Sequence, residues 1–422
     1  MKSNSSRREF LSAGLALPVA GLASAAGFGK ATGQSSPAPS PASTPKLTYR
    51  TLGKTGLRVT TVAFGPAATS DPSVIERALD MGLNYFDTAR AYQGGNNERM
   101  VGAVLNKKRK DVILSSKSTA GTKQDALNDL DTSLRELRTD YLDVWHLHGK
   151  DKTDVPDELF EAQQIAKKQG KTRFAGVSTH NAKDMIPYLV KKGSIDVIMA
   201  AYNFTMDKRF GFYRASGSRA LFLASGGHSY EKKEDTQEDG PSIDALIGQA
   251  GDAGVGLVVM KALAGGFRGV KPDNPLYPKI KSGGTMLAAL KWALKHPGVS
   301  TVVTSITDMD ELEEDVKAMA EPYSQVDEKL LARRLEQIGS LYCRMCGACE
   351  GACAKGLPVA NLLRYLTYAD GYGQFSLGRE HFLALPAEVT SVRCKDCASC
   401  TVTCPFGVKV SSRLACAQEL FA

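Results

Sequence analysis

Four polar residues recur along the chain at nearly equal intervals and could together perform acid–base chemistry. Asp87, Lys117, His148 and Ser178 each end a short run of residues that favour β-strands, and 30, 31 and 30 residues separate them. Each interval is about the length of one strand–helix–strand repeat. If the strands are parallel, a carboxylate, an ammonium group, an imidazole and a hydroxyl meet at one end of the sheet, where they could transfer protons.

Eight β-rich runs alternate with helical patterns from Leu47 onward and predict an α/β fold. The runs are TTVAFGP, LNYFDTA, DVILSSK, LDVWHLH, FAGVST, DVIMAAYN, GLVVMKA and STVVTSI. Eight such units predict a (β/α)8 TIM barrel, in which the strand-end residues point into a mouth at the carboxyl ends of the strands. A doubly wound sheet is the alternative, but no glycine-rich dinucleotide loop follows the first run.

One connection is longer than the rest. Residues 203–242 contain glycines, serines and the charged stretch EKKEDTQEDG. Long loops of this kind are usually functional or disordered. The segment is therefore either a lid over the barrel mouth or a surface insertion.

Three of the runs and their flanks resemble the aldo-keto reductases. The stretches GLNYFDTARAY, VILSSK and LDVWHLHG carry the resemblance, which extends over about residues 47–319. That family uses an aspartate, a tyrosine five residues later, a lysine that ends the third strand and a histidine that ends the fourth. The resemblance therefore implies a catalytic tetrad of Asp87, Tyr92, Lys117 and His148.

The chemistry of carbonyl reduction needs these residue types. An ordinary tyrosine, with a pKa of about 10, is a poor acid–base catalyst at neutral pH. A neighbouring ammonium group lowers that pKa, and a carboxylate keeps the ammonium charged. We therefore predict Tyr92 as general acid, Lys117 and Asp87 as its supports, and His148 as the residue that orients the substrate oxygen. Alternation along the strand is expected to turn His146 to the opposite face, and His180 is left without a role.

The resemblance also implies a nicotinamide site, although several expected side chains differ. Ser178 matches the family, whereas Thr179 replaces an asparagine that holds the carboxamide. Met199 stands at the position of a glutamine and Met260 at that of an aromatic residue, and Met309 replaces the usual base for a 2′-phosphate. These differences weaken the case for NADP over NAD. The predicted cofactor-binding residues are Ser178, Thr179, Met199, Met260, Lys261 as a replacement charge, and Ser305.

Eight of the nine cysteines form two runs with the spacing C-x2-C-x2-C-x3-C. This is the spacing of bacterial two-cluster ferredoxins, in which the fourth cysteine binds the other cluster. It predicts two 4Fe–4S clusters in a small ferredoxin-like domain. The ligands are expected to be Cys343, Cys346, Cys349 and Cys404 for one cluster and Cys394, Cys397, Cys400 and Cys353 for the other. Structural zinc would leave four cysteines over. Disulfides fit this spacing poorly, and Cys416 is the odd cysteine.

The N-terminus predicts export. Arg7 and Arg8 precede an apolar run that ends in Ala23-Ser24-Ala25, the order of a twin-arginine signal peptide with a cleavage site. An uncleaved membrane anchor is the alternative. Residues 33–45 form a Pro/Ser-rich linker. The twin-arginine route carries folded proteins, and iron–sulfur clusters are assembled in the cytoplasm. A periplasmic or other extracytoplasmic location is therefore consistent with the predicted clusters.

These features divide the chain into three parts, namely residues 1–45, a barrel at 46–325 and a cluster domain at 326–422. The net charge of +8 is diffuse, and no arginine stripe suggests nucleic-acid binding. Three functions remain open. The chain could be an oxidoreductase that interconverts a carbonyl and an alcohol, or an exported electron-transfer protein with a degenerate barrel. In the third function the clusters are structural and hold the C-terminal domain against the barrel. The expected partners are a small carbonyl or alcohol substrate and a redox protein. No stable membrane span is expected after signal cleavage.

Overall fold

The computed structural model describes residues 46–207, 241–265 and 284–422. The predicted signal peptide and linker lie outside these ranges, as does most of the segment at residues 203–242 that is interpreted as either a lid or a surface insertion. The described residues all belong to one compact unit. In the described ranges, no helix combines the length and the apolar character that crossing a membrane requires.

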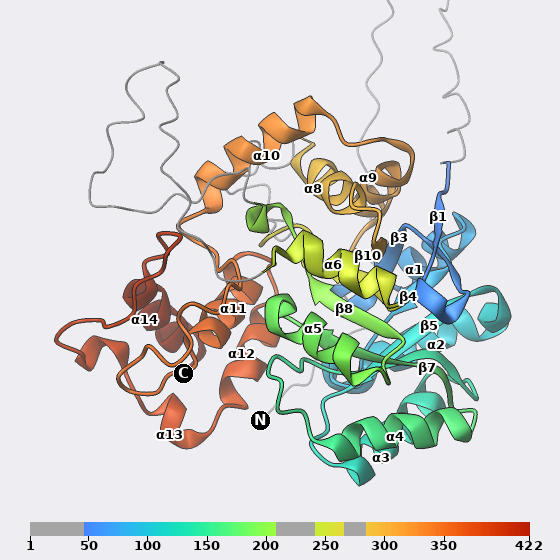
Figure 1. Ribbon diagram of the computed structural model, residues 1–422, viewed down its shortest axis with the longest axis horizontal. Coiled ribbons are helices and arrows are strands. Elements are labelled where there is room, and N and C mark those ends of the chain that lie inside the picture. The colour runs from blue at the N-terminus through green and yellow to red at the C-terminus, as the bar shows by residue number, and fades with distance from the viewer. Residues whose placement is uncertain (1–45, 208–240, 266–283) are drawn as a thin grey trace, which may run out of the picture. The chain divides into compact units, whose positions relative to one another are not determined.

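The eight predicted β-rich runs all form strands, and the strands close into a parallel barrel in the order β10-β3-β4-β5-β6-β7-β8-β9 (Figure 1). The predicted TIM barrel is thus confirmed. The strands are β3 (Val62–Gly65), β4 (Tyr85–Asp87), β5 (Ile113–Ser118), β6 (Leu142–Leu147), β7 (Thr172–Thr179), β8 (Val197–Ala201), β9 (Gly256–Met260) and β10 (Val299–Ser305).

Amphipathic helices follow the strands and bury one face each against the barrel. Several begin with a side-chain cap, as where Thr122 accepts a hydrogen bond from the backbone N–H of Asp125 at the start of α3. The barrel helices are α1 (Pro72–Asp80), α2 (Asn96–Leu105), α3 (Lys123–Glu136), α4 (Asp157–Lys168), α5 (Ala182–Lys192), α6 (Ile243–Asp252), α8 (Thr285–Leu294) and α9 (Met309–Ala320).

A hairpin of β1 (Tyr49–Thr51) and β2 (Arg58–Thr60) precedes the barrel. Its residues Leu52, Leu57 and Val59 form one apolar cluster with inward-facing strand residues such as Val144 and Val258. The barrel interior is therefore a packed core, and ligands must bind at the carboxyl ends of the strands.

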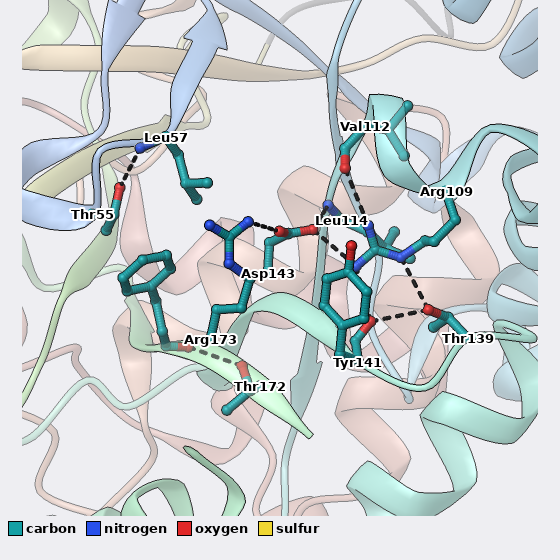
Figure 2. A network of polar contacts seen from close by, with 11 residues as sticks. Thr55, Leu57, Arg109, Val112, Leu114, Thr139, Tyr141, Asp143, Thr172 and Arg173 are labelled. Atoms are coloured by element: carbon teal, nitrogen blue, oxygen red, sulfur yellow. Dashed lines mark hydrogen bonds and ion pairs between the residues drawn. The ribbon is translucent and has the colours of Figure 1, made fainter. Parts of the chain in front are cut away.

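The amino-terminal ends of three neighbouring strands are joined by a charged clamp (Figure 2). Asp143, which is 1% exposed, accepts hydrogen bonds from Arg109 at 2.8 Å and from Arg173 at 2.7 Å. Arg109 also bonds the backbone carbonyls of Val112 and Tyr141. A buried carboxylate needs such partners, because an unpaired buried charge is strongly destabilising. This face stabilises the barrel, whereas the opposite face carries the predicted site.

The C-terminal part is helical, with α10 (Gln325–Ile338), α11 (Val359–Asp370), α12 (Phe375–Leu383), α13 (Ala387–Thr390) and α14 (Val410–Phe421). The structure describes all of residues 326–422 and has no strand there. Leu331, Leu335 and Ile338 of α10 join the barrel core, whereas α11, α12 and α14 share a second core. The term ferredoxin-like therefore rests on the cysteine spacing and not on a shared sheet.

Candidate active site at the barrel mouth

The four predicted tetrad residues meet at the barrel mouth, around the ammonium group of Lys117. Lys117 lies on β5 and is 1% exposed. Its Nζ donates to Asp87 Oδ2 at 2.5 Å, to the backbone oxygen of Thr88 at 2.7 Å and to the hydroxyl of Tyr92 at 3.4 Å. These three acceptors match the three donors of an ammonium group. The arrangement links a buried ion pair directly to the hydroxyl of Tyr92.

The ion pair keeps the lysine charged. Burial alone lowers the pKa of Lys117, but the nearby Asp87 and Tyr92 outweigh it, so the pKa lies above its ordinary value. Ser115 donates to the second oxygen of Asp87 and so fixes the carboxylate. Lys117 therefore presents a permanent positive charge to the hydroxyl of Tyr92.

Tyr92 is held as a neutral phenol. Burial raises its pKa above the ordinary value, and the charge of Lys117 opposes this shift without cancelling it. The expectation that Lys117 lowers the pKa of Tyr92 is right for that one interaction and wrong for the sum. In this environment Tyr92 can donate a proton, and Lys117 stabilises the phenolate that remains.

His148 follows β6 and stacks edge-on against Tyr92, with the ring centroids 5.7 Å apart. Burial, followed by the charge of Lys117, holds the pKa of His148 well below its ordinary value. Its Nδ1 atom is buried without a hydrogen-bond partner among the described residues. A neutral imidazole at this place can donate one hydrogen bond to a substrate oxygen.

The prediction that His146 faces away from the mouth is wrong. Residues two apart in a strand share a face, so His146 points inward with His148 and with Val144 of the barrel core. It fills the space beside Gly176, where an added Cβ atom would lie 2.3 Å from His146 Nδ1. Burial lowers the pKa of His146 to about 3. This neutral imidazole lies beneath the tetrad.

The two residues expected to hold a nicotinamide carboxamide differ in their availability. Ser178 Oγ accepts a hydrogen bond from the backbone N–H of Gly149 at 2.8 Å, which leaves its own proton to donate. Thr179 Oγ1 donates to Asp151 at 3.2 Å and accepts from the N–H of Asn181. Thr179 is therefore committed to protein contacts, and only half of the expected pair remains for a cofactor.

The other predicted cofactor residues lie in different environments. Met199 is 1% exposed and belongs to the barrel core, and Met260 packs against the same core. Ser305 ends β10, at the carboxyl face of the barrel. The described residues thus fit a nicotinamide only in part.

Sequence reasoning did not find Asp151, which organises one side of the mouth. Asp151 accepts hydrogen bonds from the N–H of His180 at 2.7 Å and from Arg364 of α11 at 3.0 Å. Burial and the charge of Arg364 lower the pKa of His180 to about 4. His180, to which the sequence assigns no role, therefore has a structural one. Arg364 lies between two apolar residues in the sequence, the only local hint that it has a buried partner.

Tyrosines of the C-terminal part also reach the mouth. Lys261 Nζ lies 4.3 Å from the ring centroid of Tyr368 and 5.4 Å from that of Tyr372. The hydroxyl of Tyr372 accepts a hydrogen bond from the N–H of Gly265. Tyr368 is close enough to Tyr92 to raise its pKa further. The predicted replacement charge thus contacts the C-terminal tyrosines.

In each set of four predicted cluster ligands, one cysteine thiol interacts electrostatically with the other three. Burial raises the pKa of Cys343, and the nearby thiols of Cys346, Cys349 and Cys404 raise it further. Burial likewise raises the pKa of Cys394, as do Cys353, Cys397 and Cys400. None of the nine cysteines, all of which the structure describes, forms a disulfide. In the described ranges no group of three or more His, Cys, Asp or Glu side chains is placed to hold a single metal ion.

Comparisons with known proteins agree with the barrel. Residues 65–210 match the sequence model of the Aldo/keto reductase family. The chain is 25% identical over 288 residues to an uncharacterized oxidoreductase, YqkF, of Bacillus subtilis (64% of this chain, 90% of the relative). It is 26% identical over 319 residues to L-galactose dehydrogenase of Arabidopsis thaliana (65% and 89%).

Two further comparisons extend this result. The chain is 22% identical over 328 residues to L-glyceraldehyde 3-phosphate reductase of Escherichia coli O157:H7 (68% of this chain, 93% of the relative). The solved structure of the aldo-keto reductase AKR11C1 from Bacillus halodurans, in its holo form, is similar with a TM-score of 0.53 and 25% identity (68% and 96%). The barrel thus contains an aldo/keto reductase family domain, and the protein is an aldo-keto reductase-like oxidoreductase.

Proposed function

We propose that this chain is an exported oxidoreductase that interconverts a carbonyl and an alcohol and carries two 4Fe–4S clusters. The single observation that carries the catalytic part is the contact of Lys117 Nζ with both Asp87 and the hydroxyl of Tyr92. Two relatives are named for a sugar and for a phosphorylated aldehyde. A sugar or a small aldehyde is therefore the proposed substrate.

The chain's own residues supply the proton chemistry. In reduction, Tyr92 gives its proton to the carbonyl oxygen, and the charge of Lys117 stabilises the phenolate left behind. In oxidation, the same phenolate takes the proton of the alcohol. His148 stays neutral and donates a hydrogen bond that orients the oxygen. Asp87 acts through Lys117, because it keeps the buried ammonium charged and in place.

A nicotinamide, NADP or NAD, is the proposed redox cofactor because the family domain suggests it. Ser178 retains a proton to donate, whereas Thr179 has none left. This partial fit makes cofactor binding the first property to measure.

Two 4Fe–4S clusters are proposed for the C-terminal part. The support is the repeated cysteine spacing and, in each set of four, the electrostatic interaction of one thiol with the other three, one of which is the last cysteine of the other run. Cys353, Cys394, Cys397 and Cys400 line a cavity of about 470 Å³. Soft thiolate ligands suit iron–sulfur clusters, and the clusters would exchange electrons with a partner protein.

Export by the twin-arginine route is proposed from the sequence alone. The paired arginines, the apolar run and the Ala-Ser-Ala site stand in the order of such a signal. The proposed location is periplasmic or otherwise extracytoplasmic. A chain that must receive its clusters before export would need a route for folded proteins.

A second candidate is an exported iron–sulfur electron-transfer protein whose barrel no longer binds a nicotinamide. Two observations favour it. Thr179 bonds Asp151, and Lys261 lies against Tyr368, so two expected cofactor contacts are used within the protein. In this case Tyr92 would be dispensable.

One experiment separates the two candidates. Anaerobically purified, cluster-loaded protein is titrated with NADPH and NADH while nucleotide fluorescence and cluster absorbance are followed. Binding of either nucleotide, together with carbonyl turnover that the Tyr92→Phe variant loses, supports the reductase. Bleaching of the clusters would add that electrons pass between the two parts. If neither nucleotide binds and Tyr92→Phe changes nothing, the reductase is refuted and the electron-transfer candidate is favoured.

A further inference from the structure

The four ligands of one proposed cluster, which we call the Cys394 set, line a cavity in the C-terminal part. The set consists of Cys353, Cys394, Cys397 and Cys400, and the cavity has a volume of about 470 Å³. Cys397 and Cys400 are exposed, and none of the four is fully buried. The lining residues all lie between residues 353 and 415, so none of them belongs to the barrel. A cluster held by this set would therefore be accessible to another protein.

The other proposed cluster adjoins the barrel. Its ligands, the Cys343 set, are Cys343, Cys346, Cys349 and Cys404. Cys343 lines a cavity of about 20 Å³ together with Lys261 and Ala264, which follow β9 of the barrel. Only Cys346 of this set is exposed, against two members of the Cys394 set. The Cys394 set thus holds the outer of the two proposed clusters.

Three cations line the same cavity as the Cys394 set, and we call them the basic collar. They are Lys355, Arg393 and Lys395, and no aspartate or glutamate is among the lining residues. Lys355 and Lys395 are exposed, and neither forms an ion pair with a carboxylate in the described ranges. Arg393 donates a hydrogen bond to the backbone oxygen of Thr390. Asp396 follows Lys395 in the chain but lies outside the lining. The edge of this cavity therefore carries positive charge.

The charge of the cluster accounts for only part of the collar. A cluster bound by four thiolates is itself negative, and nearby cations would balance it. Exposed ammonium groups, however, also attract the negative groups of a second protein. The surface beside the Cys343 set differs, because the exposed residue after Cys349 is the acidic Glu350. Arg344, the cation next to Cys343, is 8% exposed and lies over the ring of Phe406. Exposed positive charge thus adjoins the outer cluster.

We propose that the basic collar docks a small electron-carrier protein with an acidic face, which exchanges single electrons with the cluster of the Cys394 set. The inference rests on the proposed clusters and adds which of them meets the partner and what charge the partner carries. In each encounter one electron leaves the carrier, which is oxidised, and enters the cluster, which is reduced, or the reverse. Opposite charges speed such encounters, and interfaces between redox proteins are small and short-lived.

The test uses two haem proteins of opposite charge as electron acceptors, the acidic cytochrome b5 and the basic cytochrome c. Full-length, cluster-loaded protein is reduced with dithionite without oxygen, freed of the excess reductant and mixed with either acceptor. Each haem takes one electron, and its absorbance gives the rate. For the wild type, added salt should slow the transfer to cytochrome b5 and speed the transfer to cytochrome c, because salt screens both interactions.

Reversing the charge of the collar should reverse this behaviour. The double variant Lys355→Glu, Lys395→Glu should transfer electrons to cytochrome b5 roughly tenfold or more slowly at low ionic strength and at nearly the wild-type rate at high ionic strength. Lys110→Glu makes the same change at an exposed lysine before β5 and is the matched control, which should behave as the wild type. Cys404→Ser removes a ligand of the Cys343 set and should keep the salt dependence, since the outer cluster remains.

Iron analysis separates this inference from the proposed function. If the wild type binds no iron–sulfur cluster, the proposed function fails at its clusters and the inference fails with it. If the clusters are present and the double variant keeps the wild-type rates at both ionic strengths, only the inference is overturned. It is also overturned if the variant is slower at both ionic strengths alike and its cluster potential has changed, because the collar then serves the cluster's own charge.

A double variant that does not take up its clusters leaves two measurements that decide. One is the rate of the single variant Lys355→Glu, which changes a residue outside both cysteine runs. The other is the salt dependence of the wild type itself. Transfer from the wild type to cytochrome b5 that does not depend on salt would overturn the inference, as would a wild-type rate in Lys355→Glu at low ionic strength.

Discussion

Arg364 of α11 donates a hydrogen bond to Asp151, in the loop after β6, although 213 residues separate them in the sequence. Asp151 also holds the backbone of His180 and the hydroxyl of Thr179. Helix α11 is therefore connected, through the carboxylate of Asp151, to the loops at the carboxyl ends of β6 and β7. Any change that weakens this contact should affect the mouth as well as the stability of the fold.

Replacing Arg364 with Met tests this connection. Both side chains are partly exposed, at 14% for Arg364 and 24% for Asp151, so the free energy of unfolding should fall by only about 1–2 kcal/mol. The pKa of His180 should rise, because the charge of Arg364 lowers it. Urea unfolding and the NMR titration of His180 measure the two effects. Glu161→Gln removes the exposed ion pair with Lys123 and should leave both quantities unchanged.

An unchanged His180 titration in Arg364→Met would contradict the connection even if stability fell. A loss of stability alone would follow from the loss of any packed arginine side chain. The shift of the histidine pKa requires the charge itself to lie near the ring.

Lys117→Met tests how the tetrad sets the proton affinity of Tyr92. The charge of Lys117 opposes the upward shift that burial imposes, so its removal should raise the pKa of Tyr92. A higher pKa leaves less phenolate at a given pH. Alcohol oxidation needs the phenolate. The kcat/KM for oxidation should therefore begin to rise at a higher pH in this variant than in the wild type. The pH profile of kcat/KM for oxidation measures this shift.

The double variant Asp87→Asn, Lys117→Met is the matched control, because it avoids leaving an unpaired carboxylate in the site. Its profile should be displaced in the same direction but by less, because the charge of Asp87, which raises the pKa of Tyr92, is also removed. If the alkaline limb stays at the wild-type pH in both variants, Lys117 does not act on Tyr92 as the geometry implies.

The sequence predicted the barrel, and the meeting of the strand-end residues at its mouth, because both depend on a repeated pattern. Strand residues alternate along the chain, and one polar residue ends each repeat, so a spacing of about 30 residues brings Asp87, Lys117 and His148 together. The prediction for His146 was wrong because residues two apart in a strand, such as His146 and His148, share a face. The contacts of Arg364 and Tyr368 could not be predicted, since no periodic pattern relates α11 to loops more than one hundred residues earlier.

Four histidines whose pKa values are lowered by burial, His146, His148, His180 and His381, predict a loss of stability in acid. Burial, with nearby positive charge, lowers the pKa to about 3 for His146 and to about 4 for His180 and His381. In the unfolded chain each takes up a proton near pH 6.5. The unfolded state therefore binds more protons, and the stability present above pH 6.5 is lost as the pH falls towards 4.

In that pH range, the free energy of unfolding should change by at most roughly 1.4 kcal/mol per pH unit for each histidine. Urea unfolding between pH 7 and pH 5 measures it. His381→Phe keeps a ring that can stack on Tyr365, where the present centroid distance is 5.2 Å, and removes one titrating group. Its slope should be shallower than that of the wild type. Equal slopes would mean that His381 is not held neutral in the fold.

Cys404→Ser tests the assignment of the proposed clusters. Cys404 belongs to the second cysteine run, but its charge acts on Cys343 and Cys349 of the first run. The variant should therefore damage the cluster held by Cys343, Cys346 and Cys349 and spare the other, so that the iron content falls by about half. Iron analysis and electron paramagnetic resonance of the reduced protein measure this. Cys416→Ser, at an exposed cysteine outside both sets, should keep the full iron content. Damage to the Cys394 set instead would reverse the assignment, and zinc in place of iron would refute the clusters.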